Sequence, residues 1–358
     1  MIDALIVGAG PAGAACARTM AGAGAAVALI EAHPPRPFLL GEAATPDVLG
    51  LLQTLGLGIP PGAAPCRGHR SVWGGVDRVE DFPLGRVGLR LDRAAFHEHL
   101  LEGAQAAGVG LARPARLRGL SRQGETWTVA VEGPAGVEER CARLVIDASG
   151  RAAVVARALG ARRQTVDTQV ALACRTGPGQ LDALGPRVLV VTAPEGWWYA
   201  STLPGGEGVI CLFTDADLSR PLRRAAAWGE ALERVEPLRS ALAGELPTED
   251  PLVVDASASC LNRAAGPGWL AMGDALLALD PLTSSGISGA LRDGIDAAHS
   301  TLLPWLAGQS PAPLAAAWAA RANRAWGRFL RERAGHLRAA GAAGTFWARR
   351  ASGAPLRD

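Results

Sequence analysis

The sequence predicts an α/β fold: a Rossmann-like nucleotide-binding domain, an antiparallel-sheet domain and C-terminal helices. A glycine-rich turn follows the first apolar strand, short β-rich segments fill the middle of the chain, and the tail has a helical pattern. We expect residues 1–164 and 256–300 to form the nucleotide-binding domain in two parts, 165–255 to form the sheet domain, and 301–358 to be helical.

The first elements are an apolar strand, Ala4–Val7, a turn from Gly8 to Gly13 and a helix of small residues. Gly8 allows a sharp turn, Gly10 lets the backbone approach a diphosphate, and Gly13 lets the helix press on the strand. Pro11 suits the first helical turn, where its missing N–H costs nothing. The free N–H groups of this helix N-terminus predict an anion-binding site.

The second strand, Ala26–Ile30, ends at Glu31, and Ala32 follows. A carboxylate at this position accepts hydrogen bonds from the ribose of an adenine dinucleotide and repels a 2′-phosphate. The alternative is a glycine-rich loop in an unrelated α/β domain. The register of strand, glycines, helix, strand and acid favours the dinucleotide site.

The composition is that of a globular protein, with 49% apolar and 20% charged residues in a chain of 358. The net charge of +2 gives no reason to expect nucleic acid as a partner, and every one of the 36 basic residues is an arginine. The six cysteines lie far apart, so we expect neither a metal site nor a disulfide framework. The sequence has no apolar run of bilayer length and no leader pattern, which predicts a cytoplasmic protein.

Between these features the pattern predicts helices at 47–55 and about 222–242, and a helical tail over 301–350 broken by prolines. Residues 57–88 are rich in glycine and proline and suggest loops. Strands are expected where apolar and polar residues alternate. They lie at 126–131, 142–146, 170–175, 187–192, 196–202 and 209–213.

A second glycine-rich stretch runs from Gly273 to Leu291, where a strand ends in an acid and a Ser/Gly turn opens a helix. With Gly8–Gly13 and Asp147–Gly150 it resembles the FAD-dependent monooxygenase superfamily that has the para-hydroxybenzoate hydroxylase fold. The similarity is greatest to the branch with flavin halogenases, geranylgeranyl reductases and flavoproteins of quinone-cofactor maturation. It extends to Gly41-Glu42, Arg93–Leu100 and Phe346–Arg350.

The resemblance implies bound FAD, with Asp274 on the ribityl chain, Asp280-Pro281 along the flavin edge and the N–H groups near Gly286 facing the ring. Arg93 would approach the phosphate or ribityl region, or be a solvated helix residue. The sequence contains no second complete dinucleotide fingerprint, so NAD(P)H would bind transiently or an external donor would supply electrons. The implied cofactor-binding residues are Gly8, Gly10, Pro11, Ala12, Gly13, Glu31, Ala32, Arg93, Gly273, Asp274, Pro281, Ser285, Gly286 and Ile287.

The chemistry that the resemblance implies is hydroxylation by a flavin C4a-hydroperoxide, with O₂ as co-substrate and an aromatic or electron-rich substrate. The expected substrate wall is Gly196–Pro204, which departs from the halogenase Trp-x-Trp motif because its two tryptophans are adjacent. One of the pair should face the cavity and the other the core. We take Glu42, His69, Trp198 and Tyr199 as candidate catalytic residues.

Halogenases need a lysine downstream of the Gly-Glu motif. The matching stretch here, Cys66–Ser71, has none, and arginine cannot replace an amine nucleophile. The substrate is then an aromatic small molecule or a bulky, polypeptide-bound Trp or Tyr. The alternatives are a flavin-dependent reductase or dehydrogenase and a non-catalytic FAD-binding assembly factor.

The C-terminal helices combine aromatic and basic residues. They form either a helix with a solvated basic face or a docking rim for a large acidic partner. The residues are Trp318, Trp326, Phe329 and Leu330 with Arg321, Arg324, Arg328, Arg331, Arg333 and Arg338.

Overall fold

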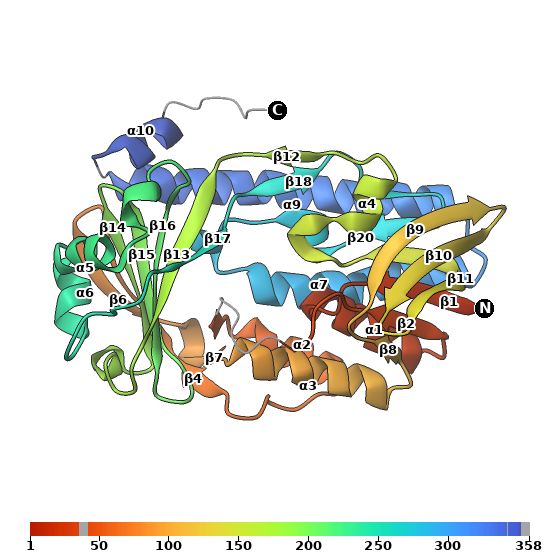
Figure 1. Ribbon diagram of the computed structural model, residues 1–358, viewed down its shortest axis with the longest axis horizontal. Coiled ribbons are helices and arrows are strands. Elements are labelled where there is room, and N and C mark those ends of the chain that lie inside the picture. The colour runs from red at the N-terminus through yellow and green to blue at the C-terminus, as the bar shows by residue number, and fades with distance from the viewer. Residues whose placement is uncertain (36–41, 342, 352–358) are drawn as a thin grey trace.

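The structure is a computed structural model that describes residues 1–35, 42–341 and 343–351. The glycine of the Gly-Glu motif, Gly41, lies outside the described residues. Two large sheets lie at opposite ends of the molecule, with helices between and around them (Figure 1). This arrangement confirms the predicted α/β fold with a parallel sheet, an antiparallel sheet and C-terminal helices.

The first sheet contains the glycine-rich turn and is parallel across its centre, in the order β20-β11-β1-β2-β8. The antiparallel strands β19, β10 and β9 extend it. Its strands are β1 (Ile2–Val7), β2 (Val27–Ile30), β8 (Gly110–Ala112), β9 (Arg116–Gln123), β10 (Thr126–Gly133), β11 (Gly136–Asp147), β19 (Ala265–Gly266) and β20 (Trp269–Ala271).

The second sheet has seven strands in the order β17-β13-β16-β15-β14-β5-β6. All neighbours are antiparallel except β14 and β5, which run parallel. Its strands are β5 (Gly68–Trp73), β6 (Val76–Asp81), β13 (Gln169–Thr176), β14 (Arg187–Ala193), β15 (Gly196–Thr202), β16 (Gly208–Asp215) and β17 (Leu252–Asp255).

Residues 68–81 therefore belong to this second sheet, although the expected sheet domain began at 165 and the region 57–88 suggested loops. Glycine, proline and charged residues hide the strand pattern there. Two small three-stranded sheets complete the strands. They contain β3 (Ala43–Ala44), β7 (Gly88–Arg90) and β4 (Ala64–Cys66), and β12 (Arg163–Thr165), β18 (Ser259–Leu261) and β21 (Leu277–Ala278).

The helices pack on both sheets and connect them. They are α1 (Pro11–Gly22), α2 (Asp47–Thr54), α3 (Arg93–Ala106), α4 (Val154–Ala158), α5 (Ala225–Glu233), α6 (Glu236–Ala241), α7 (Gly286–Ala297), α8 (Leu303–Leu306), α9 (Pro311–Ala340) and α10 (Thr345–Ala351). The 3₁₀ turns η5 (Gly273–Ala275) and η6 (Pro281–Thr283) precede α7.

Two of the expected helices differ in detail. The helix expected at 222–242 is two helices, because Pro237 lies in the first turn of α6 and opens a new helix there. Pro304 does not interrupt the tail, because a π-helical turn, Ala298–Leu302, lies directly before it in a helix that continues from α7 into α8, and such a turn accommodates the missing N–H.

Helix α9 joins the two halves of the molecule. At 30 residues it is about 45 Å long, and it crosses the view from one sheet to the other (Figure 1). The Trp318 Nε1–H donates to the Ala271 carbonyl on β20 at 2.9 Å, and the Trp73 Nε1–H on β5 donates to the His336 carbonyl at 2.9 Å. The helix thus fixes how the sheets face each other.

The second sheet is covered on both faces, and this explains why all eight residues of β16 are buried. On one face Trp198 and Leu212 pack against Trp228 of α5, which lies at the outer side in Figure 1. On the other face Trp197 and Phe213 belong to a cluster with residues of α9 and α10. That second face is turned toward the first sheet.

Candidate functional site

A cavity of about 1340 Å³ lies between the two large sheets. One wall is built from the carboxyl ends of β1 and β2 and the first residues of α1, α3 and α7. The opposite wall is the inner face of the second sheet. A volume above the usual range for one small ligand, about 300–1,000 Å³, suits a dinucleotide together with a substrate.

The glycine turn shapes the first wall. Gly8 has φ +104°, and a Cβ there would lie 2.3 Å from the Ala148 carbonyl oxygen. A Cβ on Gly13 would lie 2.0 Å from the Gly8 carbonyl oxygen, so α1 can approach β1 only because this residue has no side chain. At Gly10 no described atom lies within 4 Å of an added Cβ. The open space beside Gly10 is a cradle for a diphosphate.

Glu31 lies at the end of β2, where its carboxylate is held by the backbone. Its Oε2 accepts from the Ala9 N–H and its Oε1 from the His33 N–H, both at 2.9 Å. Ala32 lies beside it in the cavity lining. These bonds orient the carboxylate at the edge of the cavity, as a ribose acceptor requires.

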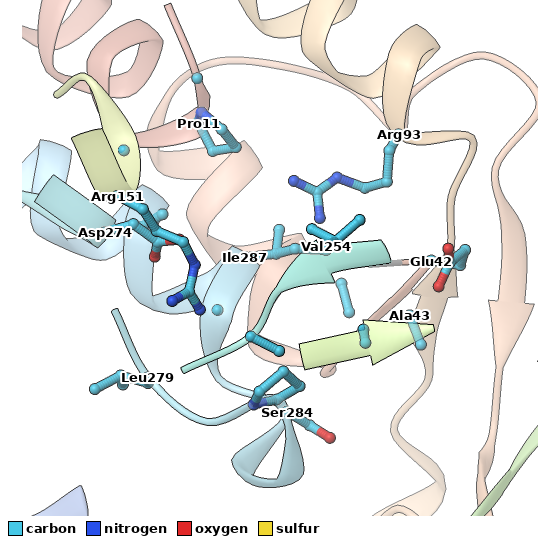
Figure 2. Close-up of a pocket in the computed structure, with 18 of the residues that line it drawn as sticks. Pro11, Glu42, Ala43, Arg93, Arg151, Val254, Asp274, Leu279, Ser284 and Ile287 are labelled. Carbon is cyan, nitrogen blue, oxygen red and sulfur yellow. The ribbon is translucent and has the colours of Figure 1, made fainter. Parts of the chain in front are cut away.

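Three arginines surround the carboxylate of Asp274. It is enclosed by protein yet exposed to the cavity that it lines, and burial raises its pKa while Arg151, Arg93 and Arg163 oppose the rise. Figure 2 shows Arg151 beside Asp274, with Arg93 projecting into the cavity from another element. Arg93 opens α3, which Asp92 caps by accepting from the Ala94 and Ala95 N–H groups at 2.8 and 3.0 Å.

Arg151 is a lining residue that the sequence reasoning missed. Its position directly after Asp147–Gly150 is the signal that would have found it, since that motif ends β11 beside the cavity. The Asp147 carboxylate holds the turn by accepting from the Ser149 hydroxyl at 2.6 Å and the Ala156 N–H at 2.8 Å.

The second glycine-rich stretch closes the floor of the cavity. Leu279, Asp280, Pro281 and the following residues of η6 line it, together with Gly286 and Ile287 at the start of α7. The N-cap of α7, Ser285, makes no side-chain bond to the helix, so the first N–H groups have no cap from that residue.

Two predicted residues of this stretch act behind the cavity wall instead of lining it. Gly273 has φ +56°, and a Cβ there would lie 2.8 Å from the Ala12 Cβ, so this turn packs on α1. The Ser285 hydroxyl lies 2.8 Å from that of Thr283. Both residues shape the wall, as does Gly13.

The polar groups of this wall fit FAD. An open cradle at Gly10, a helix N-terminus, an oriented carboxylate at Glu31 and an enclosed carboxylate at Asp274 match diphosphate, ribose and ribityl groups in turn. The uncapped start of α7 offers N–H groups and a positive dipole end to an anionic ring edge. The described residues contain no cluster suited to a metal ion.

The opposite wall is aromatic. Trp197 and Phe213 stack with ring centroids 3.9 Å apart, and Tyr199 lies next to them on the same face of β15. Our choice of Trp198 as a catalytic residue is corrected by this geometry: Trp198 is fully buried on the other face, packed on Trp228. Alternation along the strand places Trp197 in the cavity.

Tyr199 and Glu42 are close enough to affect each other electrostatically. Burial raises the pKa of Tyr199 well above its usual 10.0, and the charge of Glu42 raises it further. Glu42 is 2% exposed and precedes β3, where its backbone carbonyl accepts from the Leu91 N–H at 2.7 Å. A protonated phenol and the carboxyl group of Glu42 thus share the substrate side of the cavity.

His69 also lines this wall, farther out on β5. Its Nε2 lies 3.5 Å from Glu80 Oε2 on the edge strand β6, and both side chains are about half exposed. Other exposed lining residues lie on this side of the cavity, among them Val76, Arg78, His336 and Ala339, so the cavity is open here as well as beside exposed lining residues such as Arg116 and Asp255. His69 therefore lies near an opening of the cavity, whereas Glu42 is buried.

The chain is similar to several known proteins, although no family model matches it. LodB of Marinomonas mediterranea, which is named as an FAD-dependent oxidoreductase, is 28% identical over 322 residues, covering 84% of this chain and 83% of the relative.

Two solved structures superpose over nearly the whole chain. The myxobacterial chondrochloren halogenase CndH has a TM-score of 0.84 at 22% identity, covering 98% of this chain and 85% of its own. The peptidyl tryptophan dihydroxylase QhpG has a TM-score of 0.78 at 25% identity, covering 98% and 78%. The chain therefore has the fold of these flavin-dependent enzymes and is similar in sequence to an FAD-dependent oxidoreductase.

Proposed function

We propose that this protein is an FAD-dependent monooxygenase that hydroxylates an aromatic ring held against Trp197 and Phe213. The observation that carries this proposal is the placement of a wall fitted to FAD opposite an aromatic wall within one cavity. Reduced flavin supplies the activation of O₂ when it is bound. One oxygen atom enters the substrate, the other leaves as water, and NAD(P)H or an external donor supplies the two electrons.

The residues of the chain would hold the substrate and its ionisable proton. The Tyr199 hydroxyl, which its raised pKa keeps protonated into the alkaline range, donates a hydrogen bond to the substrate. A carboxylate at Glu42 accepts the N–H of an indole or the O–H of a phenol, which makes the ring more electron-rich. The stacked Trp197 and Phe213 orient the ring and exclude water from it.

A polypeptide-bound Trp or Tyr is the substrate that we favour. The cavity opens at the edge strand β6, where lining residues are exposed, and a side chain can enter there while its backbone stays outside. QhpG, which is described as acting on peptidyl tryptophan, has the same fold over 98% of this chain.

The exposed face of α9 offers such a polypeptide a docking surface. Arg324, Arg328, Arg331 and Arg338 are exposed and fall within a stripe about 80° wide and 21 Å long. None of the four is in an ion pair within the described part of the chain, whereas Arg321 bonds Asp293 and Asp296. We name these four residues the arginine stripe, and it fits an acidic segment.

The absence of lysine argues against halogenation, because the sequence offers no amine to form the reactive adduct. The absence of lysine has no bearing on a flavin-dependent reductase, which is the second candidate function. A non-catalytic FAD-binding assembly factor is the third.

The decisive experiment reconstitutes the protein with FAD, reduces it without oxygen, and mixes it with ¹⁸O₂ and a tryptophan-containing peptide. Mass spectrometry should find a labelled oxygen atom in the peptide. Oxidation of the flavin without any labelled product from a panel of Trp and Tyr peptides and small aromatics would contradict the proposal. Oxygen-independent reduction of an added alkene would favour the reductase, and a flavin that cannot be reduced would favour the assembly factor.

A further inference from the structure

The carboxylate of Asp280 is saturated by bonds from three parts of the chain. Its Oδ2 accepts from Arg333 Nε at 2.8 Å, and its Oδ1 accepts from Gln169 Nε2 at 3.1 Å and from the Leu282 N–H at 3.0 Å. The side chain is 1% exposed. A surface loop rarely holds a carboxylate this deeply unless the carboxylate positions something.

The segment that Asp280 holds is the cavity floor. Asp280 caps η6, its backbone carbonyl accepts from the Thr283 hydroxyl at 3.0 Å, and residues up to Ser284 line the cavity. Ser284 has φ +48°, a conformation that a residue with a side chain adopts only under constraint. Figure 2 shows Leu279 and Ser284 on the loop that curves below Ile287 at the start of α7.

Arg333 reaches this loop from a distant element, α9. Its side chain is 7% exposed, and its second nitrogen bonds Asp167, whose side chain is 10% exposed. One guanidinium thus joins two buried carboxylates, Asp280 and Asp167. The planar fork of arginine can make both bonds at once, which the single nitrogen of lysine cannot do in the same geometry.

The contacts continue from Asp167 to the second sheet, whose inner face is the aromatic wall of the cavity. Arg350 of α10 lies 4.0 Å from Asp167 and donates to Asp215 Oδ1 on β16 at 2.8 Å. Asp215 also pairs with Arg349. The floor of the cofactor cavity is therefore linked through α9 and α10 to the strand that bears Phe213.

We propose that Arg333 is a positioning residue for the cofactor, which fixes the η6 loop and the start of α7 against the flavin ring through Asp280. It acts through Asp280 and does not itself line the cavity. Without its positive charge, the buried carboxylates of Asp280 and Asp167 would lie together behind the cavity floor, with Arg350, 4.0 Å from Asp167, as the remaining cation. The added negative charge would disfavour the reduced, anionic flavin, and the loop would lose its attachment to α9.

The test measures the flavin in the absence of substrate and oxygen. Arg333→Met should raise the FAD dissociation constant about tenfold or more, as loss of an outer orienting contact commonly does, and should shift the midpoint potential of the bound flavin to more negative values. Arg333→Lys should restore the potential in part, because it keeps the charge without the fork. Arg187→Met is the matched control, since Arg187 also pairs with a carboxylate, Asp81, but lies outside this chain of contacts.

A second variant separates positioning from stability. Asp167→Asn combined with Arg333→Met removes one of the two buried carboxylates that Arg333 neutralises, and it should recover part of the thermal unfolding temperature while the FAD dissociation constant stays raised. The proposal fails if folded Arg333→Met, or the double variant, binds FAD with the affinity and potential of the parent protein. Because no substrate is involved, this result is independent of whether the protein hydroxylates anything.

Discussion

Trp197 and Trp198 are neighbours in the chain, yet they lie on opposite faces of the second sheet. Trp197 stacks on Phe213 at 3.9 Å within the cavity wall, and Trp198 packs on Trp228 at 4.9 Å in the outer core. The same residue type therefore has two roles at adjacent positions. Substitutions at the two positions should separate substrate binding from stability.

We expect Trp198→Ala to lower the free energy of unfolding by about 3–5 kcal/mol, because it leaves a large cavity beside α5. We expect Trp197→Phe to fold normally and to raise KM for the aromatic substrate. Chemical denaturation and steady-state kinetics check the two effects. A Trp198→Ala protein as stable as the parent, or unchanged kinetics for Trp197→Phe, would show that the faces have been misassigned.

A matched pair of glycine substitutions tests the cofactor cradle. Gly10 has φ −69° and open space around an added Cβ, so Gly10→Ala should leave the fold intact and weaken FAD binding about tenfold or more by filling the cradle. Gly13→Ala should instead destabilise the apoprotein by about 1–3 kcal/mol, since its Cβ overlaps the Gly8 carbonyl. Flavin fluorescence titration and thermal unfolding give the two readouts; equal effects at both positions would argue against the cradle.

Tyr199 and Glu42 predict a specific pH dependence. Burial and the charge of Glu42 raise the pKa of Tyr199 well above 10.0, so its hydroxyl stays protonated through alkaline pH. We expect kcat/KM to show no decline from this group up to pH 10. Tyr199→Phe should lower kcat/KM by about a hundredfold with FAD binding unchanged.

Glu42→Gln is the companion variant, because it removes a negative charge that opposes ionisation of Tyr199. The alkaline limb of the pH profile should then move to lower pH. An alkaline limb below pH 10 in the parent protein that disappears in Tyr199→Phe would contradict the assignment.

The arginine stripe predicts a difference between large and small substrates. Changing Arg324, Arg328 and Arg331 to Glu should raise KM for an acidic Trp-containing peptide about tenfold and leave turnover of a small indole unchanged. The effect should diminish as salt is added, because exposed charges are screened. The control changes three exposed arginines on other segments, Arg86, Arg220 and Arg234, to Glu. It should change KM for neither the peptide nor the small indole.

Much of the cavity wall that fits FAD could be predicted from the sequence, because the motifs that form it are local. The first β-α-β unit lies within 31 residues, and the roles of Gly8 and Gly13 follow from a turn and a close contact that only glycine permits. The resemblance then supplied the remote stretches, Asp147–Gly150 and Gly273–Leu291. The structure brings both beside that unit.

The substrate wall was harder to predict because its partners are far apart in sequence. Alternation showed that only one tryptophan of the pair faces the cavity, but nothing local says which one. Phe213 meets Trp197 only through the pairing of β15 with β16. In the sequence, Arg333 looks like one more basic residue on a helix. Its buried ion pair with Asp280 joins residues that are 53 positions apart, and such a long-range contact leaves no periodic pattern in the sequence.

The parallel pairing of β5 with β14 has a consequence for how the protein is made. The hairpin at residues 68–81 leaves the ribosome more than a hundred residues before β14 and the strands beyond it, so it has no sheet to join when it first emerges. Two apolar residues, Trp73 and Val76, flank its turn, and they must stay out of aggregates until translation passes β14. Separate expression of the two halves should for this reason yield two insoluble fragments.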